Sequence, residues 1–485
     1  MSERLAGRAL LAATGLLCAS CMVGPDYKAP VPVAPSGWPQ ALEGGVVEDA
    51  AAAAATTDVG QTWWKTLGDP LLDDLIARAI AGNTDVGHAI AQVRVARAAR
   101  SGASAALFPD LDATVDYQRR QSPGTTVSPT SSREFNDYSV GFDSAWEIDL
   151  FGGLRRSNEK AAAELEAAGA DLREVLISVL AEVARNYVEV RSLQARLTIA
   201  TDNVRSQRDT ADLVRWRFQA GLANALDVDQ AEYNLAETRS RVPALETELA
   251  AARNRIAVLT GASAGSLDAE LATAGPIPSP PANVTVGLPA DLLRRRPDVA
   301  AAERRLAAAT AAVGVATADL YPSLSLSGSF TIAATDVAAL DSAAARGFSV
   351  GPTLRWNLFD AGRLRSVVAE RSAQADAALA DWQAAVLAAY EETANALVAY
   401  AREQERRDRL AEARAAARKA QELARAQYQN GLVDFQRVLE AERAVFGFEE
   451  SLAVSEAEVV TDLVALYKAL GGGWKSVECR DDGCS

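Results

Sequence analysis

Apolar residues recur at every seventh position in three long stretches of this 485-residue chain. These positions are Leu176, Val183, Val190, Leu197 and Val204 in the first stretch, Val228, Leu235, Val242, Leu249 and Ile256 in the second, and Val438, Val445, Leu452, Val459 and Leu466 in the third. Sustained seven-residue spacing with charged flanks is typical of coiled-coil helices rather than of a globular domain. Helices over 155–219 and 362–429 would each be about 100 Å long at 1.5 Å per residue. Pro243 interrupts the second stretch, where we expect a local kink.

Four other segments alternate apolar and polar residues with a period of two, as β-strands do. They cover about 110–120, 135–149, 322–332 and 347–358, with Ser/Gly/Pro/Thr-rich loops at 121–134 and 333–346. Four such strands, with Trp and Phe near their ends, favour a transmembrane β-barrel over an amphipathic sheet in water. Four strands cannot close a barrel, and open edges are not tolerated in lipid, so further copies of the chain must supply the rest. The pattern does not distinguish two, three or four copies.

The order of helices, strands and turns occurs twice, which indicates an internal duplication. Residues 218–235 align with 428–445 without a gap, and Gly221 falls in register with Gly431. We expect one repeat over 69–275, with a helical hairpin that turns at 220–227, and a second over 276–470, with its turn at 430–435. An extended N-terminal segment (21–68) and a C-terminal tail (471–485) flank the repeats.

Charge and hydropathy argue against nucleic-acid binding and against a membrane-spanning helix. The formal net charge is −15 and the sequence pI is about 4.8, so nucleic-acid binding, which needs clustered Lys and Arg, is not expected. After the N-terminus the chain has no stretch of about 18 uncharged apolar residues, the length that a membrane-spanning helix requires.

The N-terminus has the features of an export signal over residues 1–20. Arg4 and Arg8 precede an apolar run, and small residues stand just before Cys21. This arrangement resembles the lipobox of bacterial lipoproteins, in which the cysteine becomes the lipidated first residue. Cys18 departs from the usual Leu or Val of that motif, and an ordinary signal cleaved near Ala19 is the alternative. We expect lipidation of Cys21.

The other mature cysteines are Cys479 and Cys484, close together in the C-terminal tail. An export compartment permits a disulfide between them, and a free tail is the alternative. A metal site is disfavoured because two cysteines without a nearby His supply too few ligands.

No segment carries a pattern that predicts catalysis. Residues 261–265 match G-x-S-x-G, but they follow a long helix instead of a strand, and the only histidine, His88, precedes them. Gly152-Gly153 lacks the Gly-Lys-Ser/Thr ending of a phosphate-binding loop. We therefore expect no enzyme activity, no cofactor and no metal.

Several motifs resemble the outer-membrane efflux factor family, the TolC- and OprM-like proteins, and more closely its lipoprotein NodT-like branch. They are CMVGPDYKAP at 21–30, WWK at 63–65, LGDPLL at 67–72, GLPADLLRRRPD at 287–298 and LYP at 320–322. The resemblance covers essentially the whole mature chain. It implies a homotrimer that forms a twelve-stranded outer-membrane barrel and a periplasmic tunnel of twelve helices.

The resemblance also implies partners and a location. Such proteins receive substrates from an inner-membrane pump, usually of the resistance-nodulation-division (RND) class, through a periplasmic membrane-fusion adaptor. Segments 24–68, 261–290 and 471–485 would form a belt around the tunnel. Met22 fits export to the outer membrane, because family members lack Asp after the lipidated cysteine.

The two Gly-Leu turns would be the periplasmic tips of the tunnel. Glycine also ends helices for purely structural reasons, but the family docks its adaptor at these turns, here Gly221, Leu222, Gly431 and Leu432.

The family further places acidic rings early in the second return arm, where they constrict the tunnel. The candidate gate residues by spacing from the turns are Glu440, Arg437 (where some members carry Asp), Asp227 and Asp229. Arg437 with Asp227 or Asp229 could form a latch between neighbouring arms. The alternative is that all four are solvated charges at helix starts.

The expected function is that of an outer-membrane duct that passively conducts small molecules out of a tripartite efflux pump. A duct for type I polypeptide secretion is the main alternative, and a secreted coiled-coil scaffold without a barrel is a second. The sequence does not name the substrate.

Overall fold

The computed structural model describes residues 22–31, 38, 43–48, 62–121, 134–286 and 295–474, with the backbone of 479–480 and 483–484. The chain divides into two compact units. The first comprises Met1–Val31, Val93–Ala168 and Ala301–Trp382, and the second Pro32–Gln92, Gly169–Ala300 and Gln383–Ser485. Each unit takes segments from both sequence repeats. The lipobox (with Cys21), residues 122–133 of the predicted loop over 121–134 and most of the GLPADLLRRRPD motif lie outside the described residues.

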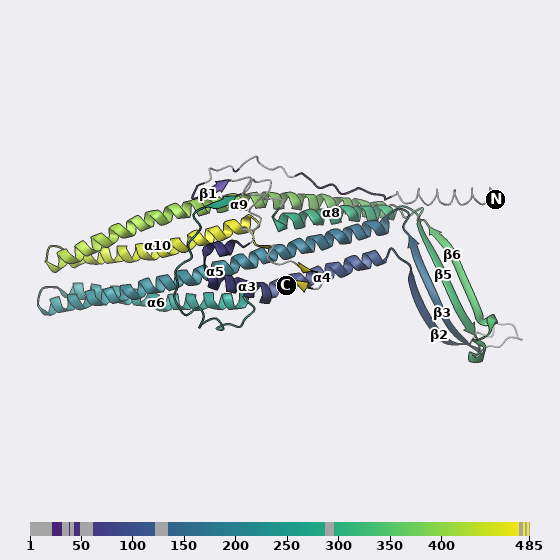
Figure 1. Ribbon diagram of the computed structural model, residues 1–485, viewed down its shortest axis with the longest axis horizontal. Helices are drawn as coiled ribbons and strands as arrows, with labels where there is room; N and C mark the ends of the chain where they lie inside the picture. The colour runs from purple at the N-terminus through teal and green to yellow at the C-terminus, as the bar shows by residue number, and fades with distance from the viewer. Residues whose placement is uncertain are drawn as a thin grey trace. The chain divides into compact units, whose positions relative to one another are not determined.

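The first unit contains a four-stranded antiparallel sheet (Figure 1). Its strands are, in spatial order, β2 (Asp110–Gln121), β3 (Glu134–Ile148), β5 (Ser323–Ala334) and β6 (Arg346–Arg355). The two hairpins of the duplication therefore lie edge to edge, with β3 paired to β5.

The register gathers most of the large apolar residues of all four strands on one face. Val140 lies opposite Val115 on one side and Ile332 on the other. Phe330 lies between Phe142 and Phe348 in the same way. Since side chains alternate between faces along a strand, the serines, threonines and aspartates of these strands share the opposite face, except for Ser144, which lies opposite Leu111 on the apolar face.

The end of the fourth strand was predicted wrongly. The alternation suggested a strand to residue 358, but β6 ends at Arg355. The pairing with β5 stops at Arg355, opposite Ser323, where β5 begins. Trp356 lies just past the strand, and its indole donates to the Leu320 carbonyl at 3.1 Å. The predicted loop over 333–346 contains two short 3-10 helices, η3 (Val337–Ala339) and η4 (Ala343–Ala345).

Long helices make up most of the remaining fold. They are α3 (Pro70–Gly82), α4 (Thr84–Ala105), α5 (Gly153–Gln219), α6 (Ala225–Leu259), α8 (Pro297–Ala318), α9 (Arg363–Gln429) and α10 (Phe435–Ala469). α5 and α9 each have 67 residues, which corresponds to about 100 Å. All five heptad positions of α10 are buried, as the seven-residue pattern predicts. α6 continues through Pro243 as one helix.

Segments outside the repeats pack into the second unit. β1 (Val46–Glu48) pairs in parallel with β4 (Val284–Val286). A 3-10 helix, η2 (Trp63–Leu67), buries both of its tryptophans, and Trp63 stacks on Tyr467 at a ring distance of 5.5 Å. The sequence patterns predicted neither feature.

Candidate functional site

Two glycine turns close the helical hairpins α5–α6 and α9–α10 at the same end of the second unit (Figure 1). Gly221 and Gly431 have φ values of +74° and +73°, a left-handed conformation that favours glycine. The amides of Leu222 and Leu432 donate to carbonyls five residues earlier, at 2.7 and 2.9 Å. With the bonds from the glycine amides, these form the same helix C-cap in both turns.

Each turn presents one leucine to solvent. Leu222 is 67% exposed and Leu432 is 74% exposed. Beneath them a single apolar cluster joins the two hairpins. Its buried members are Ala211, Val214, Ala231, Leu235, Tyr428, Phe435, Val438 and Leu439. We call this set the tip core.

The return helices begin at capped residues just after the turns. The Asn224 carboxamide accepts from the Asp227 amide at 2.9 Å, and the Asp227 carboxylate accepts from the Asn224 amide at 3.3 Å. This reciprocal capping box stabilises the start of α6. Asp434 caps α10 in a similar way by accepting from the Arg437 amide at 3.2 Å. Asp227 therefore has a structural role at the helix start.

The other candidate gate residues lie on exposed helix surfaces. Arg437 forms an ion pair with Glu440 at 3.2 Å along α10. Asp229 is exposed on α6. No ion pair among the described residues of one chain joins Arg437 to Asp227 or Asp229. A latch between these groups thus remains a prediction about neighbouring chains.

Polar side chains that the sequence patterns did not single out connect the two hairpins. Arg443 donates to the Tyr233 hydroxyl at 2.7 Å and to the side-chain carboxamide oxygen of Asn234 at 3.0 Å. Arg425 pairs with the buried Glu442, which also contacts α5 through Thr210. The detectable signal was a glutamate four residues after Val438, because that spacing puts it on the apolar face of α10.

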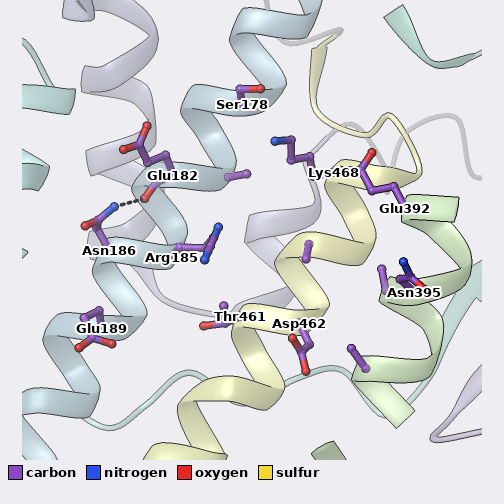
Figure 2. A pocket seen from close by; sticks show the side chains of 14 residues that line it. Ser178, Glu182, Arg185, Asn186, Glu189, Glu392, Asn395, Thr461, Asp462 and Lys468 are labelled. Atoms are coloured by element: carbon purple, nitrogen blue, oxygen red, sulfur yellow. Dashed lines mark hydrogen bonds between the residues drawn. The ribbon is translucent and has the colours of Figure 1, made fainter. Parts of the chain in front are cut away.

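A charged cavity of about 820 Å³ lies farther along the same helices, between α5, α9 and α10 (Figure 2). Its charged lining residues are Glu182, Arg185, Glu189, Glu392, Asp462 and Lys468. Burial raises the pKa of the Asp462 carboxyl to about 6, with repulsion from Glu403 and Glu458 adding to the shift and Arg185 opposing it. Asp462 thus changes charge near neutral pH.

The segment that follows Cys21 is held within the first unit by contacts with Phe151 and Arg156. The Val23 amide donates to the Phe151 carbonyl at 3.1 Å, and Asp26 pairs with Arg156 at 2.6 Å. Arg156 itself is 2% exposed. At the other end of the chain, Cys479 and Cys484 lie opposite each other in the two-stranded pairing of β7 (Cys479–Arg480) and β8 (Gly483–Cys484). The possible disulfide stays a prediction.

The described residues hold no group of three or more His, Cys, Asp or Glu side chains placed to bind a metal ion. None of the described helices is both long and apolar enough to cross a bilayer.

A duplicated sheet hairpin combined with two long, capped helical hairpins defines the class of outer-membrane channel proteins. The profile of the outer membrane efflux protein family matches residues 75–262 and 288–472. This chain belongs to that family. It is similar to Nodulation protein T of Rhizobium leguminosarum bv. trifolii, with 32% identity over 470 residues that cover 95% of this chain and 96% of the relative.

Two further comparisons agree. The pyoverdine export outer membrane protein OpmQ of Pseudomonas aeruginosa is 32% identical over 471 residues, covering 95% of this chain and 97% of that protein. The solved structure of the outer-membrane channel OprN is 39% identical, with a TM-score of 0.85, covering 94% of this chain and all of that one.

The expected fold and function are thereby confirmed. The protein is an exit duct of an efflux system in the outer membrane, with a periplasmic helical tunnel. Its fold is that of a homotrimer in which each chain gives four strands to a transmembrane β-barrel.

Proposed function

We propose that this duct passively conducts small molecules delivered by an RND-class inner-membrane pump, and that a membrane-fusion adaptor docks on the two tips of each chain. The observation that carries the proposal is the repeated tip, which presents Leu222 and Leu432 from turns of equal geometry. Exposed apolar groups at two equivalent positions suit a partner that makes the same contact twice per chain.

A passive role fits the family to which the chain belongs. We infer that the protein is not an enzyme because its family and its relatives are named as efflux and export channels. The energy for transport then comes from the inner-membrane partner. The name of one relative, a pyoverdine export protein, favours small-molecule cargo over secreted polypeptides.

Site-specific crosslinking tests the docking proposal. A photoreactive amino acid would replace Leu222 or Leu432 in cells that hold the native pump, and the captured partners would be identified by mass spectrometry. We expect one adaptor to be captured at both positions, and its RND pump to be recovered with it. The matched control is Val258, an exposed apolar residue at the opposite end of α6. Capture of the adaptor at Val258 but not at the tips would overturn the docking assignment, and recovery of an ATP-driven exporter would favour polypeptide secretion.

A further inference from the structure

The charged cavity between α5, α9 and α10 contains charges of both signs that have no partner in the chain. Its volume is about 820 Å³ (Figure 2). Two carboxylates of its lining, Glu182 and Glu392, are paired with Arg255 and Arg296. The lining side chains that make no ion pair or hydrogen bond with the described residues include Arg185, Glu189, Asp462 and Lys468. Two cations and two carboxylates are therefore left to interact with something else.

The directions of the helices sort these four charges along the cavity. Both hairpins close at the same end, so α5 runs toward its tip whereas α10 runs away from it. Glu189 therefore lies nearer the tips than Arg185, and Asp462 lies nearer than Lys468 by about 9 Å, at 1.5 Å per residue. Figure 2 shows this order, with Asp462 and Glu189 toward one end, Lys468 toward the other and Arg185 between them. The cavity thus has a negative end toward the tips and a positive end away from them.

The negative end lacks a compensating cation. Burial raises the pKa of the Asp462 carboxyl, Glu403 and Glu458 add to the rise, and Arg185 opposes it without cancelling it. A cationic group bound beside Asp462 would favour the charged form of this carboxyl. At the other end, the Lys468 ammonium has no anionic partner among the described residues. Each end of the cavity can therefore accept a group of opposite charge.

The cavity lies on the side of α5 that faces away from the outer segments. Arg191 donates to the Thr273 carbonyl, in the segment after α6, at 2.9 Å and to the Tyr187 hydroxyl at 2.8 Å. Residues advance by 100° along an α-helix, so Arg185 and Glu189 each lie about 160° around α5 from Tyr187. The segment after α6 is expected to surround the tunnel, and the opposite face of α5 is therefore expected to line the lumen.

We propose that this cavity binds small organic zwitterions, with the cationic group of the ligand beside Asp462 and Glu189 and its anionic group beside Lys468 and Arg185. The inference rests on the proposed function in one respect, since only a duct for small molecules brings such ligands past this face. The two charges of a fitting ligand stand about 9 Å apart. The volume of the cavity leaves room for the body of a drug-sized molecule between them.

The test measures binding to purified trimers, without pump or transport. Ligand-observed NMR compares three probes of equal chain length: ε-aminocaproate, which carries both charges, and caproate and hexylammonium, which carry one each. We expect ε-aminocaproate to bind about tenfold more tightly than either of the others, because it alone pairs with both ends of the cavity.

Charge-removing variants assign the two ends. Lys468→Gln should weaken the binding of ε-aminocaproate and caproate and leave that of hexylammonium unchanged. Asp462→Asn combined with Glu189→Gln should weaken ε-aminocaproate and hexylammonium and spare caproate. Glu412→Gln is the matched control and should change no affinity, because Glu412 pairs with Arg409 on the exposed surface of α9. Heat-resistant trimers show that each variant is assembled.

Equal binding of the three probes would overturn the site, as would ε-aminocaproate binding that none of the cavity variants weakens, because the four charges would then be merely solvated. Binding of no probe would also overturn it, since a neighbouring copy would then fill the cavity in the trimer. If ε-aminocaproate binds as expected but crosslinking at the tips recovers an ATP-driven exporter, the small-molecule proposal fails and the binding site stands.

Discussion

The indole of Trp146 donates to the carbonyl oxygen of Leu107 at 3.0 Å. The second repeat makes the same bond between Trp356 and Leu320 at 3.1 Å. Both acceptors begin a Leu-aromatic-Pro corner that leads from a helix into a strand. The duplication has therefore kept a side-chain bond as well as the order of elements, although Trp146 lies within β3 and Trp356 lies just past β6.

We expect Trp146→Phe and Trp356→Phe to lower stability by similar amounts, about 1 kcal/mol each, because each removes one hydrogen bond while keeping most of the aromatic surface. The measurement is the temperature at which trimers dissociate in detergent. Trp216→Phe is the control, since this exposed indole makes no hydrogen bond among the described residues. A Trp216→Phe variant as unstable as the other two would show that the loss of ring size, not of the bond, is responsible.

Regular repetition explains how much of the fold the sequence predicts. The heptad pattern of the long helices and the alternation along β3 extend over many residues. They therefore predict these elements despite a local exception such as Pro243 in α6. The β1–β4 pairing has no such signal, because three-residue strands from distant segments show no period of their own. The end of β6 was missed because the apolar alternation continues beyond Arg355, whereas the pairing with β5 stops there, opposite Ser323, where β5 begins.

The same distinction applies to the candidate site, where some residues could be found from the sequence pattern and others could not. Gly221 and Gly431 were found because only a few residue types suit a left-handed helix cap, and the sequence repeats them in register. The contacts of Glu442 involve partners from two other helices, and the raised pKa of Asp462 depends on burial and on its neighbours. Neither environment is local in sequence, so no pattern along one helix could reveal it.

Charge placement on the sheet tests which face meets lipid. Val140 shares its face with Val115 and Ile332, whereas Ser139 lies on the opposite face. We expect Val140→Arg to destabilise the barrel by about 2–4 kcal/mol near the bilayer midplane, and Ser139→Arg to cost far less. Folding of the two variants into lipid vesicles across a urea series gives the comparison. If Val140→Arg and Ser139→Arg destabilise the barrel equally, the assignment of the lipid-facing side of the sheet is wrong.

Asp462 predicts a pH dependence of stability. Its pKa rises from 3.8 in the unfolded chain to about 6 in the fold, so the charged form is disfavoured there. This group's contribution is therefore fully present below about pH 3.8 and is lost as pH rises through about 6. Asp462→Asn should be more stable than wild type at pH 8, on the order of 1–2 kcal/mol after solvent screening.

The stability difference should shrink as the pH falls toward 4. Thermal dissociation of the trimers across this range measures it, with Glu412→Asn as an exposed control on α9. A constant difference between pH 4 and pH 8 would contradict the assigned titration.

We expect the lipid on Cys21 to help anchor the protein in the membrane and to have no part in transport. One acylated residue is a modest anchor beside a trimeric barrel, and the adjoining segment is already held by Val23 and Asp26. Cys21→Ala should therefore still reach the outer membrane if a signal cleavage site remains. Membrane fractionation measures whether the variant reaches the outer membrane. Lipidation itself is tested on the wild type by mass spectrometry, and an unmodified N-terminal peptide would contradict the lipoprotein assignment.

The last prediction concerns the gate. Arg437 and Glu440 pair along one face of α10, and threefold symmetry would bring three copies of this face together at a narrow mouth. Removing either partner leaves like charges to repel one another across the axis. We expect low conductance of wild-type trimers in a planar bilayer, and a sharp increase in Arg437→Ala or Glu440→Ala.

A control must separate this electrostatic effect from a weakened helix start. Asp434→Ala provides it, because Asp434 caps the Arg437 amide and its loss should cost about 1 kcal/mol of stability while leaving the Arg437–Glu440 pair in place. If conductance rises as much in Asp434→Ala as in the other two variants, fraying of α10 and not charge opens the mouth. Unchanged conductance in Arg437→Ala and Glu440→Ala, with trimers intact, would remove both residues from the gate.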